Sequence, residues 1–286
     1  MSYRSAFRPG LFRDRIAIVT GGGSGIGRCI AHELAALGAK LALLGRRQER
    51  LDKVAAEIET DGGAARGFAC DIREEDQVAA AVKAVLAAFG RLDCLVNNAG
   101  GQFAAPLEAI SLRGWEAVVR NNLTGAFLMS REAQRQWMGE HGGAIVNIVA
   151  DFWNGMPSMA HSGAARAGVV NLTETAASEW ARFNIRVNAV APGWIESSGL
   201  ESYPVENRGR MKALRQAVPL KRFGDESEVA AAVTFLLSEA AGFVTGVTLR
   251  VDGGVPNHRH TFPVPEHEPA PRFRGFPGAT KLDWLE

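Results

Sequence analysis

The chain has 286 residues, 47% of them hydrophobic, and its 32 basic and 31 acidic side chains give a formal net charge of +1. This balance excludes the strongly basic surface that nucleic acids or anionic membranes attract. No run of about 18 apolar residues is present, and residues 1–15 lack the apolar core of a signal peptide. We therefore expect a cytoplasmic protein without a membrane or nucleic-acid partner.

The first predicted elements are a short apolar strand at 16–19 and a helix that carries Ile26, Ile30 and Leu34. Between them lies the glycine-rich turn Thr20-Gly-Gly-Gly-Ser-Gly-Ile-Gly27, and a second strand at 40–44 completes a βαβ unit. Glycines in such a turn let the backbone approach a phosphate, and the helix N-terminus offers free N–H groups. The turn therefore predicts a site for a dinucleotide pyrophosphate.

The second strand ends in Gly45-Arg46-Arg47, where an NAD-binding unit usually places an acidic residue against the ribose 2′-hydroxyl. Arginine suits bidentate contact with a phosphate, so Arg46 and Arg47 favour NADP(H), and Arg28 in the first helix turn is positioned to assist. The alternative is that both arginines are a solvated helix start.

Apolar periodicity predicts the remaining elements and, from them, an α/β fold: a Rossmann-type, doubly wound parallel sheet of about seven strands with helices on both faces. Further strands are expected at 67–70, 92–96, 144–149, 185–191 and 247–251, and helices around 51–58, 78–89, 115–127, 162–183 and 225–238. We expect one domain over 1–254 and a Pro- and His-rich extension over 255–286 that wraps a surface or a neighbouring subunit. The three cysteines show neither disulfide pairing nor metal-ligand spacing, so no metal site is predicted.

Four further motifs follow the predicted strands and helices in a familiar order: Asn97-Asn-Ala-Gly100, Asn122-Leu-Thr-Gly125, Pro192-Gly193 and Asp252-Gly-Gly254. Over residues 12–254 this order resembles the short-chain dehydrogenase/reductase family. The segments Gly100-Gly-Gln-Phe103, 161–169 and Val264-Pro-Glu-His267 are similar to its peroxisomal trans-2-enoyl-CoA reductase subgroup. The resemblance implies a homotetramer that reduces the C2=C3 bond of an acyl-CoA with NADPH.

The resemblance also implies which residues bind the cofactor. Besides Arg46, Arg47 and Arg166, these are Gly21, Ser24, Gly25 and Ile26 for the pyrophosphate; Asp71 and Ile72 for the adenine; Asn98, Ala99 and Gly100 on the adenosine ribose side; and Pro192, Gly193 and Ile195 along the nicotinamide. Asp71 has an independent rationale, because it ends a parallel strand at the edge where such sheets bind ligands. For Asn97 and Asn98 the alternative is ordinary turn chemistry.

One departure from the family decides the mechanism. Most members use Tyr-x-x-x-Lys, whereas neither Tyr3 nor Tyr203 is followed by lysine four residues later. Ser162 and Arg166 occupy the usual motif positions; the subgroup's alternative positions, two turns later, read Val170 and Glu174. Hydride addition to a ketone needs an acid that protonates the oxygen, and losing this acid lowers the rate by a factor on the order of 10²–10⁴. Conjugate reduction forms an enolate instead, whose oxygen needs only well-placed hydrogen-bond donors.

The candidate catalytic residues are His161, Ser162, Arg166 and Asn122. His161 has a pKa range suited to acid–base work, and Arg166 keeps a charge where the lysine would reach the cofactor ribose. The alternatives are that His161 caps the helix or faces solvent and that Ser162 is an ordinary N-cap. Asp151 would contribute only if protonated or by orienting His161.

Three functions are therefore weighed: an NADPH-dependent enoyl-thioester reductase, a reductase of another activated double bond or carbonyl, and a non-catalytic NADP-binding protein. Apolar residues after the fifth and sixth strands favour an acyl substrate, or alternatively a subunit contact: Phe152, Trp153, Met156, Met159 and Trp194. The polar segment 196–222 is expected to be a lid; its basic residues would meet coenzyme A phosphates or belong to a solvated helix.

Overall fold

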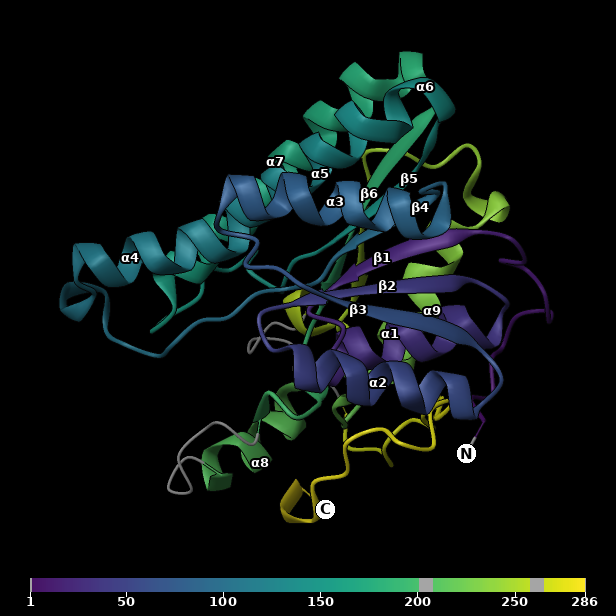
Figure 1. Ribbon diagram of the computed structural model, residues 1–286. Helices are drawn as coiled ribbons and strands as arrows, with labels where there is room; N and C mark the ends of the chain where they lie inside the picture. Colours follow the sequence, from purple (N-terminus) through teal and green to yellow (C-terminus); the bar gives the residue numbers. More distant parts are fainter. Residues whose placement is uncertain (1, 201–207, 258–264, 286) are drawn as a thin grey trace.

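A computed structural model describes residues 2–200, 208–257 and 265–285 of the chain. Its centre is a seven-stranded sheet in the order β3-β2-β1-β4-β5-β6-β9, with every neighbouring pair parallel (Figure 1). The strands are β1 (Ile16–Thr20), β2 (Lys40–Gly45), β3 (Ala64–Ala69), β4 (Cys94–Asn97), β5 (Gly143–Ile148), β6 (Ile185–Pro192) and β9 (Thr248–Val251). The predicted doubly wound α/β fold is confirmed.

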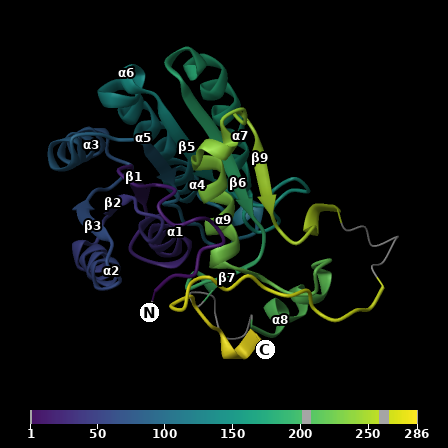
Figure 2. The same cartoon turned by 90° about the vertical axis from the view of Figure 1, so that its right-hand side faces the viewer.

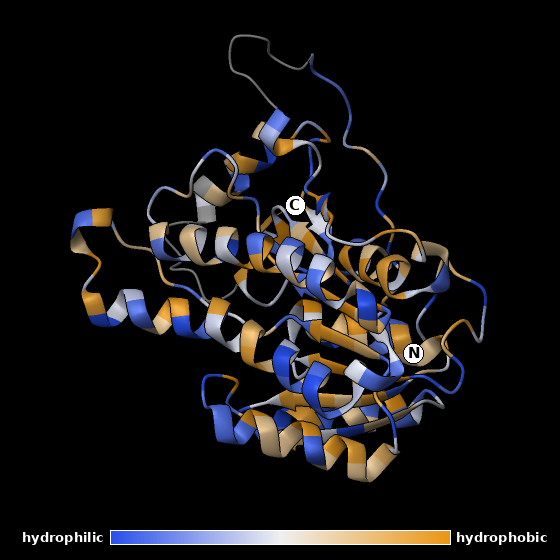
Figure 3. Ribbon diagram, turned by 90° about the horizontal axis from the view of Figure 1, so that it is seen from above, coloured by the Kyte–Doolittle hydropathy of each residue, from blue (hydrophilic) through white to orange (hydrophobic). Residues whose placement is uncertain are grey.

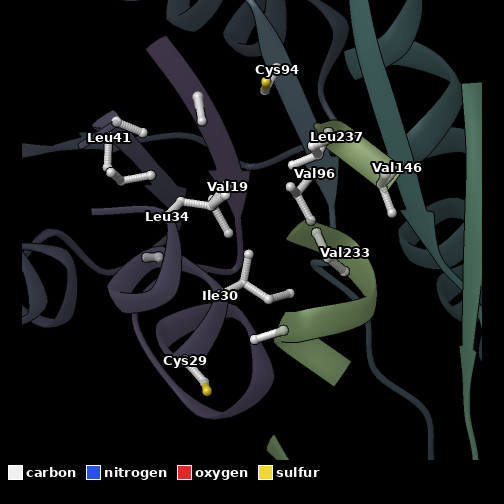
Figure 4. Packing of buried hydrophobic residues seen from close by; sticks show 14 of the residues in the cluster. Val19, Cys29, Ile30, Leu34, Leu41, Cys94, Val96, Val146, Val233 and Leu237 are labelled. Atoms are coloured by element: carbon white, nitrogen blue, oxygen red, sulfur yellow. The ribbon is translucent and has the colours of Figure 1, made fainter. Parts of the chain in front are cut away.

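The inner strands of the sheet are buried on both faces because helices cover both. In β1, Ala17 and Val19 join one hydrophobic cluster, and Ile16 and Ile18 join the other. The first cluster packs under α1 (Gly25–Ala36), α2 (Gln48–Thr60) and α9 (Glu226–Leu237); the second packs under α3 (Glu75–Phe89), α5 (Gly125–Ala133) and α7 (Ala160–Trp180). Figure 4 shows side chains of the first cluster meeting between the strands, α1 and α9, and Figure 3 shows polar residues on the outer faces of the helices.

The long helix expected around 115–127 is present but interrupted. It consists of α4 (Leu112–Val119), a π-helical turn at Arg120–Thr124, α5, a second π-helical turn at Gln134–Met138, and α6 (Gly139–His141). A π turn accommodates one extra residue within a helix. The first of these turns carries Asn122, so the irregularity lies at a predicted catalytic residue.

Other differences from the sequence prediction concern short elements and boundaries. A two-stranded sheet pairs β7 (Ile195–Glu196) with β8 (Gly224–Asp225), and strands this short leave no pattern to read. Residues 208–217 of the expected lid form helix α8 (Arg208–Ala217), whereas 201–207, with Tyr203, lie outside the described residues.

The C-terminal segment 265–285 packs on its own chain, along the side that carries α8 and α9 (Figure 2). Arg222 donates hydrogen bonds to the carbonyls of Ala270 and Pro271 and forms an ion pair with Glu228 at 2.6 Å. Arg272 pairs with the buried Glu196. The extension is therefore held by buried charged groups rather than by apolar contact alone.

A second part of this segment reaches α1. The backbone N–H of Phe276 donates to Ser227 Oγ at 3.0 Å, and its ring lies under the guanidinium of Arg28, 4.9 Å from the ring centroid. Arg28 also donates to Glu57 and to the carbonyl of Gly278. The structure thus engages Arg28 with α2 and the extension, not with the end of β2.

Candidate active site

The β1–α1 turn needs glycine at several positions. Gly21 has φ 67°, and a Cβ there would stand 2.9 Å from Asn98 Nδ2 and 3.1 Å from the Cα of Ala99. A Cβ on Gly27 would stand 2.4 Å from the same Asn98 Nδ2, and Gly25 has φ 54°. Any larger side chain would push β1, the turn and the end of β4 apart, so the glycines bring α1 close to the sheet.

The N-terminus of α1 fits a phosphate group. Ser24 is the N-cap residue, is exposed, and makes no side-chain capping hydrogen bond. The first turn contains no acidic residue. The first N–H groups of the helix and the Ser24 hydroxyl can therefore donate to an anion, which the helix dipole also favours.

Thr20 organises this turn, although the sequence reasoning gave it no role. Its Oγ1 accepts hydrogen bonds from the backbone N–H groups of Asn98 and Ala99 at 2.9 and 3.0 Å and donates to the carbonyl of Val96. The side chain of Asn98 in turn donates to the carbonyl of Thr20 at 2.9 Å. Asn98 is thus a brace between β1 and β4, and its contact with a ribose stays a prediction. A threonine directly before a glycine run, at the end of a buried strand, was the available signal.

At the ends of β2 and β3, Arg46 and Arg47 are exposed, whereas Asp71 is held by Arg73. The hydrogen bonds from Arg73 hold the pKa of the Asp71 carboxyl below its ordinary value. Asp71 therefore offers an ionised, already paired carboxylate at the predicted adenine position. The assignment of the adenine and of the 2′-phosphate to these residues stays a prediction.

Two apolar residues predicted to line the cofactor are packed within the protein. Ile72 lies against α5, with its Cδ1 2.5 Å from where a Cβ on Gly125 would stand. Ile195 pairs with Gly224 in the small sheet, and its Cδ1 stands 2.6 Å from an equivalent Cβ position there. Their side chains fix the neighbouring backbone, and contact with the adenine or the nicotinamide stays a prediction.

The start of α7 brings two candidate catalytic side chains into the interior. His161 is fully buried and Ser162 is 1% exposed. The Ser162 N–H donates to His161 Nδ1 at 2.8 Å and to the carbonyl of Met159 at 2.9 Å, so Nδ1 is an acceptor and Nε2 is the ring nitrogen that can donate. Neither His161 Nε2 nor Ser162 Oγ has a hydrogen-bond partner within the described part of the chain. The N-cap is Met159, so the N-cap interpretation of Ser162 and the solvent-facing interpretation of His161 are both wrong.

Arg166 lies one turn further along α7 and is also buried. It donates to the carbonyl of Ile148 at 2.6 Å and to Asn122 Oδ1 at 3.4 Å. Asn122 in turn exchanges two hydrogen bonds with the backbone of Gly101. Burial lowers the pKa of Arg166 to about 10, and among the described residues no carboxylate forms an ion pair with it. A buried cation without an anionic partner is costly, and a bound anion would stabilise it.

The side chains of Arg166 and Asn122 leave no room for a side chain at position 100, which is glycine. A Cβ on Gly100 would stand 2.3 Å from a terminal nitrogen of Arg166 and 2.8 Å from Asn122 Oδ1. The Asn97–Gly100 motif and the start of α7 therefore meet, which connects the predicted cofactor residues with the predicted catalytic ones.

The carboxyl ends of β5, β6 and β9 form the remaining part of the sheet edge at the predicted site. The N–H of Asp151 donates to the carbonyl of Pro192 at 3.2 Å, and Gly193 packs on Asp252, whose Cα would stand 2.7 Å from a Cβ there. Burial first, and then the charge of Asp252, raise the pKa of the Asp151 carboxyl, while Arg250 opposes them. No hydrogen bond joins Asp151 to His161 in the described ranges. An orienting role of Asp151 toward His161 therefore has no support from this geometry.

Tyr3 is remote from this edge, because its hydroxyl lies 3.9 Å from Cys29 Sγ in the core under α1.

The described residues contain no group of three or more His, Cys, Asp or Glu side chains arranged to hold a metal ion. Their helices also include none that is long and apolar enough to span a membrane.

Comparison with known proteins agrees with this arrangement. The sequence model of a family described as "Enoyl-(Acyl carrier protein) reductase" matches residues 21–256. The chain belongs to the short-chain dehydrogenase/reductase family. Membership of that family makes it an oxidoreductase that binds a nicotinamide cofactor.

Individual members of the family are similar over most of the chain. A probable 2,4-dienoyl-CoA reductase of Bacillus subtilis is 39% identical, over 84% of this chain and 96% of that protein. A peroxisomal 2,4-dienoyl-CoA reductase of Danio rerio is 37% identical, over 88% and 85%. The solved structure of a citronellol catabolism dehydrogenase (AtuB) from Pseudomonas aeruginosa is 55% identical with a TM-score of 0.80, over 88% of this chain and 99% of that one.

Proposed function

We propose that this protein is an NADPH-dependent oxidoreductase that reduces the C2=C3 double bond of an enoyl thioester. The observation that carries the proposal is a pair of polar atoms, His161 Nε2 and Ser162 Oγ, that have no hydrogen-bond partner among the described residues. They are buried at the start of α7, the helix that also carries Arg166. Buried donors without partners are rare, and a substrate oxygen that accepts from them would satisfy both.

In this proposal, each group of residues has a separate role in binding or in catalysis. The reduced cofactor supplies a hydride, and the turn from Gly21 to Ile26 binds its phosphates. Arg166, held by the carbonyl of Ile148 and by Asn122, supplies a fixed positive charge beside the Asn97–Gly100 motif. The hydride bonds to C3 of the substrate, and His161 and Ser162 donate hydrogen bonds to the thioester oxygen, on which negative charge develops as the enolate forms. A proton from water then bonds to C2, which completes the saturated product. Because His161 Nδ1 accepts from the Ser162 N–H, Nε2 is the ring nitrogen that can donate to the substrate.

The alternative function, reduction of a carbonyl, is less compatible with this site. It needs rapid protonation of the new alkoxide, and the guanidinium of Arg166 is already engaged with the carbonyl of Ile148 and with Asn122. The names of the relatives include both chemistries: dienoyl-CoA reductases on one side, and a D-threitol dehydrogenase and a 3-oxoacyl-[acyl-carrier-protein] reductase on the other. A non-catalytic NADP-binding protein is the third candidate.

The decisive experiment is a titration with NADPH and NADH followed by a panel of enoyl thioesters at fixed NADPH. The panel should include 2-enoyl-CoAs, 2,4-dienoyl-CoAs and chains with isoprenoid branches, the last because the 55% identical relative is named for citronellol catabolism. Oxidation of NADPH by at least one of them, with the saturated C2–C3 product identified, is the expected result. Turnover of ketones alone would overturn the proposed reaction, and cofactor binding without any turnover would favour the binding protein.

We also propose that the protein forms a homotetramer. A hollow of about 220 Å³ between α5, α7 and β6 is lined mostly by apolar side chains, Phe127, Leu172 and Trp180 among them, which a second copy would cover. Sedimentation of only a monomer at micromolar concentration would contradict this proposal. A cytoplasmic location stays a prediction.

A further inference from the structure

Glu226 is a buried carboxyl group that faces the start of α1. It is the first residue of α9, is 1% exposed, and belongs to a helix that packs directly on α1. Its Oε1 stands 3.8 Å from where a Cβ on Gly25 would be, and Gly25 is the first residue of α1. A carboxyl group therefore lies beside the N–H groups that are predicted to bind the cofactor's pyrophosphate.

Capping of α9 does not explain this residue. Asp225 is the N-cap and accepts from the Ser227 N–H, while Glu228 completes the capping box by accepting from the Asp225 N–H. The end of α9 is thus already satisfied by its two neighbours. An acidic side chain in the first turn has a favourable interaction with the helix dipole, but this does not require burial of the carboxyl group.

The surroundings of Glu226 disfavour its ionised form. Burial raises its pKa to about 7, and the negative charge of Asp225 adds to the effect. Hydrogen bonds from Thr280 in the C-terminal segment and the more distant charge of Arg28 oppose it. The other groups that face it are polar but neutral: the Cys29 thiol on α1, whose pKa burial raises, and the Ser198 hydroxyl beside Gly25.

Arg28 does not neutralise Glu226 by direct pairing. Its guanidinium is bound to Glu57 at 2.7 Å and to the carbonyl of Gly278. A phosphate at the start of α1 would therefore meet an ionised carboxylate at high pH and a neutral carboxylic acid at low pH.

We propose that Glu226 makes dinucleotide binding proton-coupled, because its carboxyl group takes up a proton when the cofactor's pyrophosphate occupies the β1–α1 turn. The proposal rests on the cofactor site described above. Two like charges in a poorly hydrated place repel, so the bound phosphate raises the carboxyl pKa further than burial alone. The acid form can also donate its proton to a phosphate oxygen.

The sign of the effect follows from linkage. When the pKa is higher in the complex than in the free protein, binding takes up a proton, and affinity is lost as pH rises between the two pKa values. Below pH about 6 the carboxyl group is neutral in both states, and the affinity does not depend on it. Above pH about 7 the dissociation constant should rise, by at most about tenfold per pH unit.

The test is the dissociation constant of NADH from about pH 6 to 9, measured by nicotinamide fluorescence. NADH is the probe because it lacks the 2′-phosphate, whose own proton dissociates near pH 6. For the unmodified protein we expect the dissociation constant to rise by about fivefold or more across this range. Glu226→Gln should abolish the rise and bind NADH more tightly than the unmodified protein at the high-pH end.

The matched control is Glu33→Gln. Glu33 is a second buried glutamate of the same layer with a pKa raised by burial, but it is bonded to Ser5 and lies away from the turn. This variant should keep the pH dependence of the unmodified protein. Thr280→Val removes a donor to Glu226, so it should move the onset of the rise to higher pH and gives a second test if Glu226→Gln does not fold.

Calorimetry provides a direct readout that does not involve activity. Titrating NADH at about pH 8 in two buffers of different ionisation enthalpy gives the number of protons taken up, which we expect to be clearly above zero for the unmodified protein and zero for Glu226→Gln. Binding with a flat pH profile and no proton uptake would overturn this proposal and leave the cofactor site intact. Failure of both NADH and NADPH to bind would overturn the two together.

Discussion

At the β1–α1 turn, hydrogen bonds of Thr20 and Asn98 brace the glycines, whereas at the start of α7 two buried polar atoms have no hydrogen-bond partner, and a buried cation has no anionic one, among the described residues. Thr20 and Asn98 brace the turn from within, so its shape does not depend on a ligand. His161, Ser162 and Arg166 are instead held in a costly arrangement that a ligand would relieve. Unfavourable burial of polar and charged groups of this kind is typical of functional sites.

The difference explains how the glycine-rich turn keeps its shape although Ser162 and Arg166 stand at the positions of the family's usual Tyr-x-x-x-Lys. Binding at the turn relies on backbone groups and glycines, which the motif Gly21 to Gly27 preserves. Chemistry at α7 relies on individual side chains, and the substitution of these changes which reactions are accessible. If cofactor binding at the β1–α1 turn and chemistry at the start of α7 are as separable as this comparison implies, substitutions at one region should leave the function of the other intact.

The largest effect is expected from His161→Ala. Removing the buried donor should lower turnover of an enoyl thioester by about 10²-fold or more with little change in NADPH affinity, because the histidine acts on the substrate. Steady-state kinetics and a binding titration measure the two quantities separately. The control is His141→Ala, since His141 is exposed and stacked on Trp137. Full activity of the His161 variant would contradict the assignment.

Arg166→Met should separate stability from function. Losing the charge should weaken NADPH binding and turnover together, each by about 10- to 100-fold, as expected for a charge-assisted hydrogen bond. Because the buried guanidinium has no anionic partner in the described structure, the same change should raise the midpoint of thermal unfolding. Arg166→Lys should retain more affinity than the Met variant. A lower unfolding midpoint with unchanged binding would show that Arg166 is structural.

A smaller effect is expected at the end of β2. With Arg46 and Arg47 exposed and no acid at the strand end, NADPH should bind about tenfold more tightly than NADH, a difference of about 1.4 kcal/mol. Arg46→Asp should narrow or reverse this preference while leaving turnover at saturating cofactor unchanged. Equal affinities of the unmodified protein for the two dinucleotides would refute the prediction.

The smallest effect concerns Asp151. Burial and the nearby Asp252 raise its pKa in the folded protein, so the folded state holds the proton to higher pH than the unfolded state does. Stability is then lost as pH rises above the ordinary pKa of an aspartate. Asp151→Asn should therefore raise the unfolding midpoint at about pH 8 and leave it nearly unchanged at about pH 4. An equal shift at both values would indicate a packing effect instead.

The sequence was sufficient for the sheet and its helices because long apolar strands and amphipathic helices carry a strong periodic signal. It was insufficient where contacts are made between distant segments. The burial of Glu226 depends on α1 and on Thr280, more than fifty residues away along the chain. The two-residue strands β7 and β8 have no period at all.

The same contrast applies to the site. Glycines and terminal residues of strands can be read directly, which located Gly21, Gly25 and the Asn97–Gly100 motif. The hydrogen-bonding role of each His161 ring nitrogen, the lack of a carboxylate beside Arg166 in the described part of the chain, and the bracing role of Thr20 depend on which groups meet in three dimensions. A residue type and its position in a motif do not determine those partners.

The π-helical turn at Arg120–Thr124 has a consequence for insertions and deletions. Each residue of a helix advances the side chains by about 100°, but a π turn absorbs one extra residue locally. Deleting one residue there would give a regular α-helix, in which Leu128 and Met129 keep the cluster they share with α3 while Asn122 loses the widened turn that holds it against Gly101. A homologue lacking a residue at this turn should therefore keep the packing of α5 but would have to hold its Asn differently.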